Sequence, residues 1–205
     1  MIRKISTLAL GAAVALTVGV SGVQAAPMTY TLDNPHTQIV FSVSHLGFSH
    51  SMGKFTDYEG KFIFDPENPT ASAVDVTIKA ASVDLAHDKW NDHLKNADFF
   101  NVEKFPTITF KSTKIDTTGE KTADITGDLT ILGVTKPVVL KTVYNKTDKH
   151  PYSGKMVAGF SATASIKRSD FGMTYGLPGV ADDVNIMLEV EGIQDEATAS
   201  TPATE

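Results

Sequence analysis

Apolar and polar side chains alternate along most of the chain, at the two-residue period of a β-strand. From Gln38 to His45, the side chains of Ile39, Phe41 and Val43 share one face, and His45 has the same parity. A strand with this pattern buries one face and exposes the other. Similar segments predict a very short strand over residues 30–32 and roughly eight longer ones, over residues 38–45, 58–64, 74–80, 108–115, 125–131, 138–144, 156–168 and 184–190.

Glycine, proline and serine mark the connections between these strands. The run with Gly47, Ser49–Ser51 and Gly53 predicts a loop, and Gly133 and Pro137 bracket a turn. Strands and helices do not alternate as in βαβ units, so the sequence predicts an all-β, antiparallel fold. A barrel or a closed sandwich fits, because closure removes exposed edge strands. A barrel of about eight strands is either filled by its own side chains or holds one small ligand, and the pattern leaves both alternatives open.

One segment, residues 87–110, interrupts the alternation. It contains the single tryptophan of the chain, Trp90, and predicts a short helix over residues 88–96 in which Trp90 and Leu94 share a face. Asp88 or Asn91 is expected to cap this helix. Three aromatic residues follow before the next strand: Phe99, Phe100 and Phe105. We expect this segment to form an apolar lid or side wall of the barrel.

The first 25 residues have the pattern of an export signal. Arg3 and Lys4 precede an apolar run, and Val23–Ala25 offers small or modest side chains at a cleavage site. The run is too short to span a membrane. We therefore expect residues 26–193 to form one exported domain, in a periplasm-like compartment or secreted from the cell. The last residues, 194–205, have no periodic apolar positions and predict a disordered tail.

Composition excludes several classes of function. The chain has no cysteine, so thiol catalysis, thiolate metal sites and disulfide exchange are excluded. Without the export signal, 16 basic residues face 24 acidic ones, and this acidic balance disfavours nucleic acid as a partner. The motif Gly-x-Ser-x-Gly is absent, and the pairs His45/His50 and His87/His93 lack the i, i+4 spacing of a helical zinc site. We predict neither an enzyme nor a metal site, and no required cofactor.

Two polar residues, His45 and Arg168, share the inward parity of their strands. They are candidates for contacting the polar end of a ligand. A buried guanidinium is costly unless it is paired, so an internal ion pair is an equal alternative for Arg168. Its candidate partners are Asp92, Asp98 and Asp170. The glycine-rich loop 171–180, with Met173 and Tyr175, is either a flap over one end of the barrel or an ordinary long connection.

Over Tyr30 to Ile193 the chain resembles the YceI-like family of exported polyisoprenoid-binding proteins with a lipocalin-like barrel. Four blocks in order carry the resemblance: His36–Thr37 with Ile39, Phe41 and His45; Asp92–Lys95 with Asp98–Phe100 and Phe105–Pro106; Gly127–Thr130 with Gly133–Val138; and Ile166–Gly172. The resemblance implies an antiparallel barrel around an apolar tunnel. It also implies a bound isoprenoid quinone, polyprenyl phosphate or similar amphiphile that is carried without chemical change.

Together, the patterns and the resemblance predict an exported carrier of an isoprenoid-type lipid, with transient membrane contact, as a monomer or a homodimer. The alternative is an exported stress-response or interaction protein with a solid barrel that binds a protein partner through its surface. Interior volume separates the two. The residues expected to contact the ligand are Phe41, His45, Trp90, Leu94, Phe99, Phe100, Phe105, Phe110, Leu129, Ile131, Phe160, Arg168, Phe171 and Met173.

Overall fold

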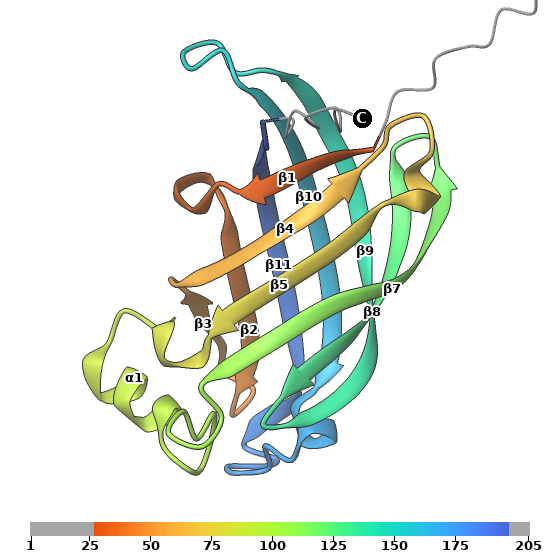
Figure 1. Cartoon of the computed structure of the whole chain (residues 1–205). Helices are drawn as coiled ribbons and strands as arrows, with labels where there is room; N and C mark the ends of the chain where they lie inside the picture. The colour runs from red at the N-terminus through yellow and green to blue at the C-terminus, as the bar shows by residue number, and fades with distance from the viewer. Residues whose placement is uncertain (1–26, 197–205) are drawn as a thin grey trace, which may run out of the picture.

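The computed structural model describes residues 27–196 of the chain (Figure 1). The predicted export signal lies outside these residues, as do residues 197–205 of the predicted tail. The strands are β1 (Met28–Leu32), β2 (Gln38–His45), β3 (Ser49–Phe55), β4 (Tyr58–Phe64), β5 (Ala73–Lys79), β6 (Val83–Asp84), β7 (Thr107–Gly119), β8 (Thr122–Ile131), β9 (Val134–Lys149), β10 (Met156–Lys167) and β11 (Val180–Gln194). The helix α1 (Asp88–Lys95) is accompanied by short 3-10 helices η1 (Asn34–His36), η2 (Pro69–Ala71), η3 (Ala80–Ser82) and η4 (Arg168–Phe171).

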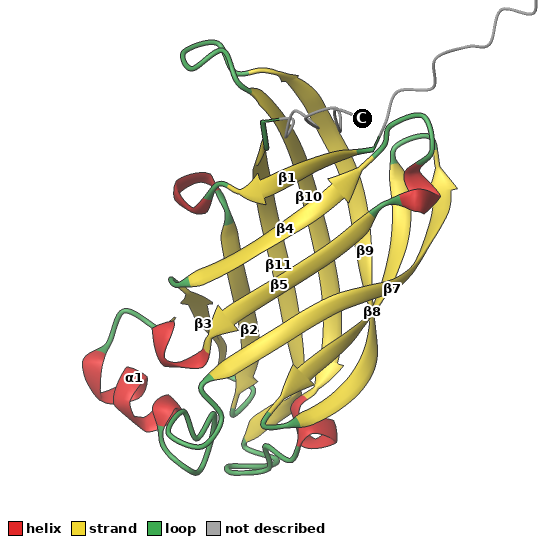
Figure 2. Cartoon of the chain, viewed as in Figure 1, coloured by secondary structure: helices red, strands yellow, loops and turns green. Residues whose placement is uncertain are grey.

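All strand pairs are antiparallel, and the sheet closes on itself where β1 pairs with β11. Both β1 and β2 pair with β11, so they act as one long bent strand. In the same way β3 continues into β4 and β6 continues β5, since β3 pairs with β2 and β6 while β4 pairs with β1 and β5. Three bent strands and β7–β11 thus surround the interior in chain order (Figure 2). The predicted all-β, antiparallel, lipocalin-like barrel of about eight strands is confirmed.

Two predicted connections are wrong. Residues 49–53 do not form a loop but belong to β3, which pairs with β2 along its whole length. The glycine there has a packing reason: a Cβ at Gly53 would lie 2.9 Å from Cε1 of Phe41, so only glycine lets that ring lie against the strand. The predicted turn at Gly133 ends before Pro137, which lies within β9. Pro137 is tolerated because β9 pairs only with β8 in this region, and edge positions accept proline.

The segment between β6 and β7 fills a gap in the barrel wall. Among the described strands, β7 pairs with β5 as far as Lys79 and does not pair with β6. The predicted helix lies beside this gap, at the lower end of the barrel in Figure 1. Its cap differs from the expectation: the N–H groups of Trp90 and Asn91 donate to the carbonyl of His87, and no side chain caps the start of the helix. Asn91 instead accepts a 2.7 Å hydrogen bond from Leu85 N and donates to Asp84, which ties α1 to β6.

The interior face has the alternation that the sequence predicts, with small residues beneath large ones. A Cβ at Gly127 on β8 would lie 2.7 Å from Cε2 of Phe110 on β7, so this glycine lets the ring lie flat against the wall.

The last strand passes the predicted boundary at residue 193: Gln194 pairs with Tyr30, and the carboxylate of Asp195 accepts a hydrogen bond from Lys61 Nζ at 2.7 Å. No helix within residues 27–196 has the length and apolar character needed to cross a membrane.

Candidate functional site

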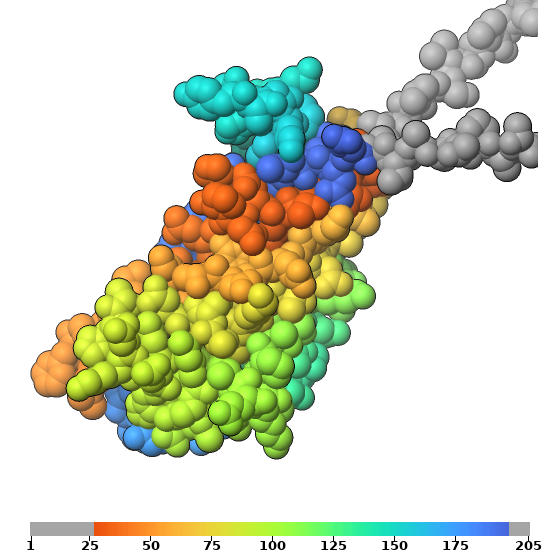
Figure 3. Space-filling view, turned by 60° about the vertical axis from the view of Figure 1, so that its left-hand side comes forward, coloured from red at the N-terminus to blue at the C-terminus, as the bar shows by residue number. Residues whose placement is uncertain are grey.

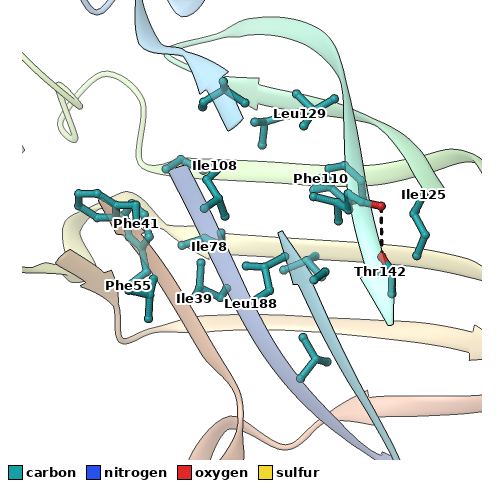
Figure 4. Close-up of a pocket in the computed structure, with 18 of the residues that line it drawn as sticks. Ile39, Phe41, Phe55, Ile78, Ile108, Phe110, Ile125, Leu129, Thr142 and Leu188 are labelled. Carbon is teal, nitrogen blue, oxygen red and sulfur yellow. Dashed lines mark hydrogen bonds between the residues drawn. The ribbon is translucent and has the colours of Figure 1, made fainter. Parts of the chain in front are cut away.

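The barrel encloses a cavity of about 620 Å³. Its wall consists of the inward aliphatic and aromatic side chains of the strands, such as Ile39, Ile78, Leu129 and Leu188 (Figure 4). The cavity extends from the α1 segment and the loop after η4 at one end to the β7–β8 turn near Lys121 at the other. The interior is therefore hollow. The sequence left open whether the barrel is filled, because parity shows which side chains point inward but not whether they meet.

The residues predicted to contact a ligand line this cavity, with the exception of Phe105. The lining set includes Phe41, His45, Trp90, Leu94, Phe99, Phe100, Phe110, Leu129, Ile131, Phe160, Arg168, Phe171 and Met173. Phe105 lies against the β8–β9 turn, where its Cε1 would be 2.9 Å from a Cβ at Gly133. The ammonium group of Lys104 lies 5.2 Å from the centre of its ring. Ligand contact itself stays a prediction for the residues that line the cavity.

Five aromatic rings pack together at the end of the barrel opposite α1. Phe160 stands edge-on to Phe62 and Phe64, with ring centroids 5.5 and 5.1 Å apart. Tyr30 stacks on Phe62 at 5.0 Å, and Tyr144 packs against Phe64 at 5.2 Å. Edge-to-face and offset contacts of this kind are favourable. They narrow this end of the interior. Only Phe160 was singled out from the sequence, because the neighbours of a ring across the barrel are set by strand order.

At the α1 end, three rings from two separate segments meet. Tyr175, from the loop after η4, lies 5.3 Å from both His93 and Phe99 of the α1 segment. His93 and Phe99 are themselves 5.0 Å apart, and His93 Nε2 lies 3.3 Å from Asp98 Oδ2. The two segments expected to act as lid and flap therefore touch one another. His93 and Tyr175 line the cavity as well, and the contact between them has no signal in the sequence.

Deeper in the wall, Phe100 stands edge-on to Phe55 of β3 at 5.5 Å. This contact holds the chain that follows α1 against β3, beside the gap in the barrel wall. His45 and Trp90 also border the cavity at this end, and both are exposed to solvent. A ligand with a polar group would find solvent and an imidazole here. The opposite end presents the aromatic cluster and, at the β7–β8 turn, the exposed side chains of Glu120 and Lys121.

Arg168 does not form the internal ion pair that was one expectation for it. Its buried guanidinium donates to four backbone carbonyls, two in the following loop and two at the start of β11. Nε bonds to Ala181 O at 2.8 Å and Nη2 to Val180 O at 2.7 Å, while Nη1 bonds to Met173 O and Tyr175 O at 3.0 and 2.8 Å. Burial lowers the pKa of this guanidinium, and the nearby Asp182 opposes that effect. The carbonyls replace a carboxylate because the loop folds around the side chain, so Arg168 holds the loop that carries Tyr175.

Asp182 fixes the other end of the same loop. Its carboxylate accepts hydrogen bonds from the backbone N–H of Ser169 at 2.9 Å and from the Ser169 hydroxyl at 2.8 Å. These two bonds, the backbone one first, lower the pKa of Asp182. The loop is thus held from inside by Arg168 and from outside by Asp182.

Within residues 27–196, one group of metal-binding residue types lies away from the cavity mouth. Ligand atoms of Asp33, His36 and Glu191 lie within 4.8 Å of one another. His36 Nδ1 lies 2.8 Å from Asp33 Oδ2, and this hydrogen bond raises the pKa of His36. The pair closes the short turn η1, and the backbone carbonyl of Glu191 accepts from Thr37. The pairing of Asp33 with His36 is accounted for by the turn, and we assign no metal to the group.

Comparison with known proteins gives one consistent result. The family model described as the YceI-like domain matches residues 30–192. A UPF0312 protein of Ectopseudomonas mendocina is 45% identical over 185 residues, covering 89% of this chain and 96% of that protein. The crystal structure of BcnA from Burkholderia cenocepacia superposes with a TM-score of 0.72 at 25% identity, covering 78% of this chain and 98% of BcnA. A polyisoprenoid binding domain from Saccharophagus degradans, implicated in plant cell wall breakdown, has a TM-score of 0.64 at 16% identity, covering 82% and 99%, which supports the fold alone.

Proposed function

Since the chain belongs to the YceI-like family, and since its barrel is hollow, we propose that it binds an isoprenoid-type lipid in the cavity and carries or sequesters it. The hollow, apolar interior is the observation that carries this proposal. Each CH₂-sized group that leaves water contributes roughly 0.8 kcal/mol, so an apolar channel is sufficient for tight binding of a long hydrocarbon tail. The polar end of the lipid then stays near solvent.

The dimensions of the cavity favour one chain over two. On β8, the residues that line the cavity lie between Thr122 and Ile131. This stretch of ten residues spans about 30 Å at the rise of a β-strand. A volume of about 620 Å³ spread over that length makes the cavity a long, narrow channel. Such a channel suits one extended, methyl-branched tail better than two chains side by side. We therefore favour an isoprenoid quinone or a polyprenyl phosphate over a lipid with two acyl chains.

The α1 end is the proposed entrance. His45 and Trp90 border the cavity there and are exposed, whereas the five-ring cluster narrows the other end. Entry of a bulky tail requires the α1 segment and the loop after η4 to separate, which breaks the contacts of Tyr175 with His93 and Phe99. His45 is the proposed head-group contact. Arg168 has only one N–H left beyond its four carbonyl bonds, so it acts chiefly on the loop.

Several observations support binding over catalysis. The Saccharophagus degradans domain of similar fold is a polyisoprenoid binding domain, and the shared fold makes a related ligand the natural proposal here. Within residues 27–196, no serine hydroxyl is hydrogen-bonded to a histidine, so the arrangement that a hydrolase of the serine type needs does not occur there. A solid barrel with a surface partner, the alternative considered above, does not fit a hollow interior.

We also propose that the protein is exported. The support is the pattern of residues 1–25, a basic start followed by an apolar run. A free lipid carrier is needed where a long isoprenoid must cross water, and a periplasm-like space between two membranes is such a place. Expression of the full chain, followed by determination of the N-terminus of the exported product, tests this proposal. A start at Ala26 supports it, and recovery of the uncleaved chain from the cytoplasm contradicts it.

A matched pair of substitutions on one strand tests lipid binding. Ala162 on β10 lines the cavity and is buried, whereas its neighbour Thr163 is exposed on the outer face. Ala162→Phe should fill the channel and abolish uptake of ubiquinone and undecaprenyl phosphate, measured by native mass spectrometry of the purified protein. Thr163→Phe adds the same ring outside and should leave uptake unchanged. Equal uptake by both variants would reject the proposed site. Preferential binding of a two-chain phospholipid by the natural chain would reject the proposed class of lipid.

A further inference from the structure

Several large apolar side chains that remain exposed lie at one end of the barrel. Phe48, at the tip of the β2–β3 turn, is 88% exposed, and Leu46 beside it is 58% exposed. Trp90 of α1 is 52% exposed, and Tyr175 and Leu177 of the loop after η4 are exposed as well. The three connections that carry these residues all lie at the lower end of the barrel in Figure 1. We call this set of five residues the apolar rim.

The apolar rim surrounds the proposed entrance of the cavity. Trp90 and Tyr175 line the cavity and are also exposed. The β2–β3 turn is joined to the loop after η4, because Leu46 N donates a 2.7 Å hydrogen bond to Gly179 O. Figure 3 shows the orange β2–β3 turn projecting beside the yellow-green α1 segment, with the blue loop after η4 below them. The rim is thus continuous with the interior wall and does not lie on a separate face.

Two of the three connections carry no formal charge, although the protein is acidic overall. Residues 44–53 and 172–179 contain no Asp, Glu, Lys or Arg, while one residue in five of the chain is charged. An uncharged surface with protruding aliphatic, Trp and Tyr side chains matches the interfacial zone of a bilayer, where such residues are enriched. No charged group of these two connections would lose its water on insertion. Electrostatic docking on anionic lipid would require the opposite composition.

We propose that the apolar rim docks the entrance of the barrel onto the surface of a lipid bilayer, so that a bound lipid passes between bilayer and cavity without crossing water. This inference rests on the proposed function and names the surface and partner through which it operates. The bilayer is preferred over a protein partner because the rim consists of separate protruding tips around an opening. Tips of this kind insert among fluid lipids more readily than they form a flat interface.

The single tryptophan of the chain makes this proposal testable without labels. Trp90 is part of the rim but also lines the cavity, so its fluorescence is followed in Ala162→Phe, in which the channel is filled, as well as in the natural chain. On addition of phosphatidylcholine vesicles the emission should shift to shorter wavelength, and bromine on the acyl chains should quench it. Because two of the three connections are uncharged and α1 carries as many acidic as basic residues, a tenfold increase in salt should change vesicle partitioning by less than about twofold. Absence of both shift and quenching would overturn the proposal.

Two exposed aromatic residues at opposite ends of the barrel provide the matched variants. Phe48→Ser should reduce co-flotation with vesicles by about tenfold or more, since a large apolar side chain no longer leaves water. Tyr152 lies in the β9–β10 turn, is 94% exposed, and serves as the control. Tyr152→Ser should co-float like the natural chain. Equal loss in both variants, or no loss in either, would contradict a role for the rim.

Sedimentation and lipid uptake separate the remaining outcomes. If Phe48→Ser changes the mass of the free protein in sedimentation, the rim joins two copies of the chain, and the proposal is wrong. Ala162→Phe should still bind vesicles while it takes up no ubiquinone, which shows that docking and cargo binding are independent. Uptake of ubiquinone from detergent without any vesicle binding would overturn the docking proposal alone. Vesicle binding by the natural chain without ubiquinone uptake would support docking and contradict the proposed cargo.

Discussion

Tyr175 packs edge-on against Phe99, with ring centroids 5.3 Å apart and ring planes 65° apart. The contact joins the loop after η4 to the α1 segment beside the entrance of the cavity. An edge-to-face pair contributes about 0.5–1.5 kcal/mol beyond the area that it buries. Tyr175→Ala should therefore weaken the closed arrangement and speed the release of bound ubiquinone by about tenfold. Stopped-flow transfer of ubiquinone from the protein to detergent micelles measures this rate.

The control for this prediction is Tyr152→Ala, which removes an exposed tyrosine far from the entrance. It should release ubiquinone at the natural rate. An unchanged rate in Tyr175→Ala would mean that the lipid leaves without separating the two segments, and the entrance would then have to lie elsewhere in the wall.

Arg168 provides a second prediction, on stability. Arg168→Met leaves four carbonyls of the loop and the start of β11 without their donor, and bonds to a charged group each contribute about 1.5–3 kcal/mol. Because the loop relaxes and water reaches some carbonyls, we expect a loss of roughly 3–5 kcal/mol in the free energy of unfolding. Urea denaturation measures it. The neighbouring surface change Lys167→Met serves as control and should leave the urea midpoint close to that of the natural chain.

If Arg168→Met kept its stability and lost only lipid binding, the guanidinium would be a head-group ligand and the carbonyl contacts incidental. Arg168→Lys helps to separate the two roles. A lysine keeps the positive charge but reaches fewer of the four carbonyls, so it should fall between the natural chain and Arg168→Met in stability.

The walls of the cavity could be predicted from the sequence, and the meeting points of the side chains could not. Parity along one strand is a local property, which is why Ile39, Phe41 and His45 were placed on the inner face and do line the cavity. The contacts of Arg168 and Tyr175 depend on how a loop folds back and on which strands are neighbours. Nothing in the local pattern encodes either. The strand β3 was missed for the same reason, because its Ser and Gly residues suggest a loop until the pairing with β2 is known.

For the helical insertion, too, part of the structure could be predicted from the sequence and part could not. Its position and length follow from the spacing of Trp90 and Leu94, but its cap was expected from Asp88 or Asn91 and is absent as a side-chain bond. Asn91 bonds instead to a neighbouring segment that lies close only in the folded chain. Phe105 was placed with the ligand contacts because it follows Phe99 and Phe100. The chain turns between them, and Phe105 covers Gly133 instead.

Asn91 is the subject of a third prediction. Asn91→Ala removes its bonds to Leu85 N and Asp84 and should cost about 1–2 kcal/mol locally. No residue of α1 is fully buried, so the helix depends on this tie, and its amide hydrogens should exchange faster. Hydrogen exchange with mass spectrometry resolves the effect by segment. Asn145→Ala, at an exposed site on β9, should leave exchange in α1 unchanged. Unaltered exchange in Asn91→Ala would assign the attachment of the helix to Phe100 alone.

Asp182 gives a prediction on pH. The bonds from Ser169 N and Oγ favour its ionised form, so its folded pKa lies below the ordinary value of 3.8. A carboxyl group with a lowered folded pKa contributes stability that is complete above its unfolded pKa and is lost as the pH falls through the folded pKa. The contribution of Asp182 should therefore be complete at neutral pH, begin to decline below about pH 4, and be lost as the pH falls through the folded pKa.

Asp182→Asn removes the charge and keeps one acceptor for Ser169. The urea midpoint of the natural chain should exceed that of the variant at about pH 6, and the gap should shrink steadily as the pH is lowered below about 4. A gap that stays constant between these values would mean that shape and hydrogen bonding, not ionisation, decide the effect. A gap that widens on acidification would reverse the sign, and Asp182 would then have to be protonated more readily in the folded chain than in the unfolded one. In that case the loop that carries Tyr175 could not be held by the carboxylate.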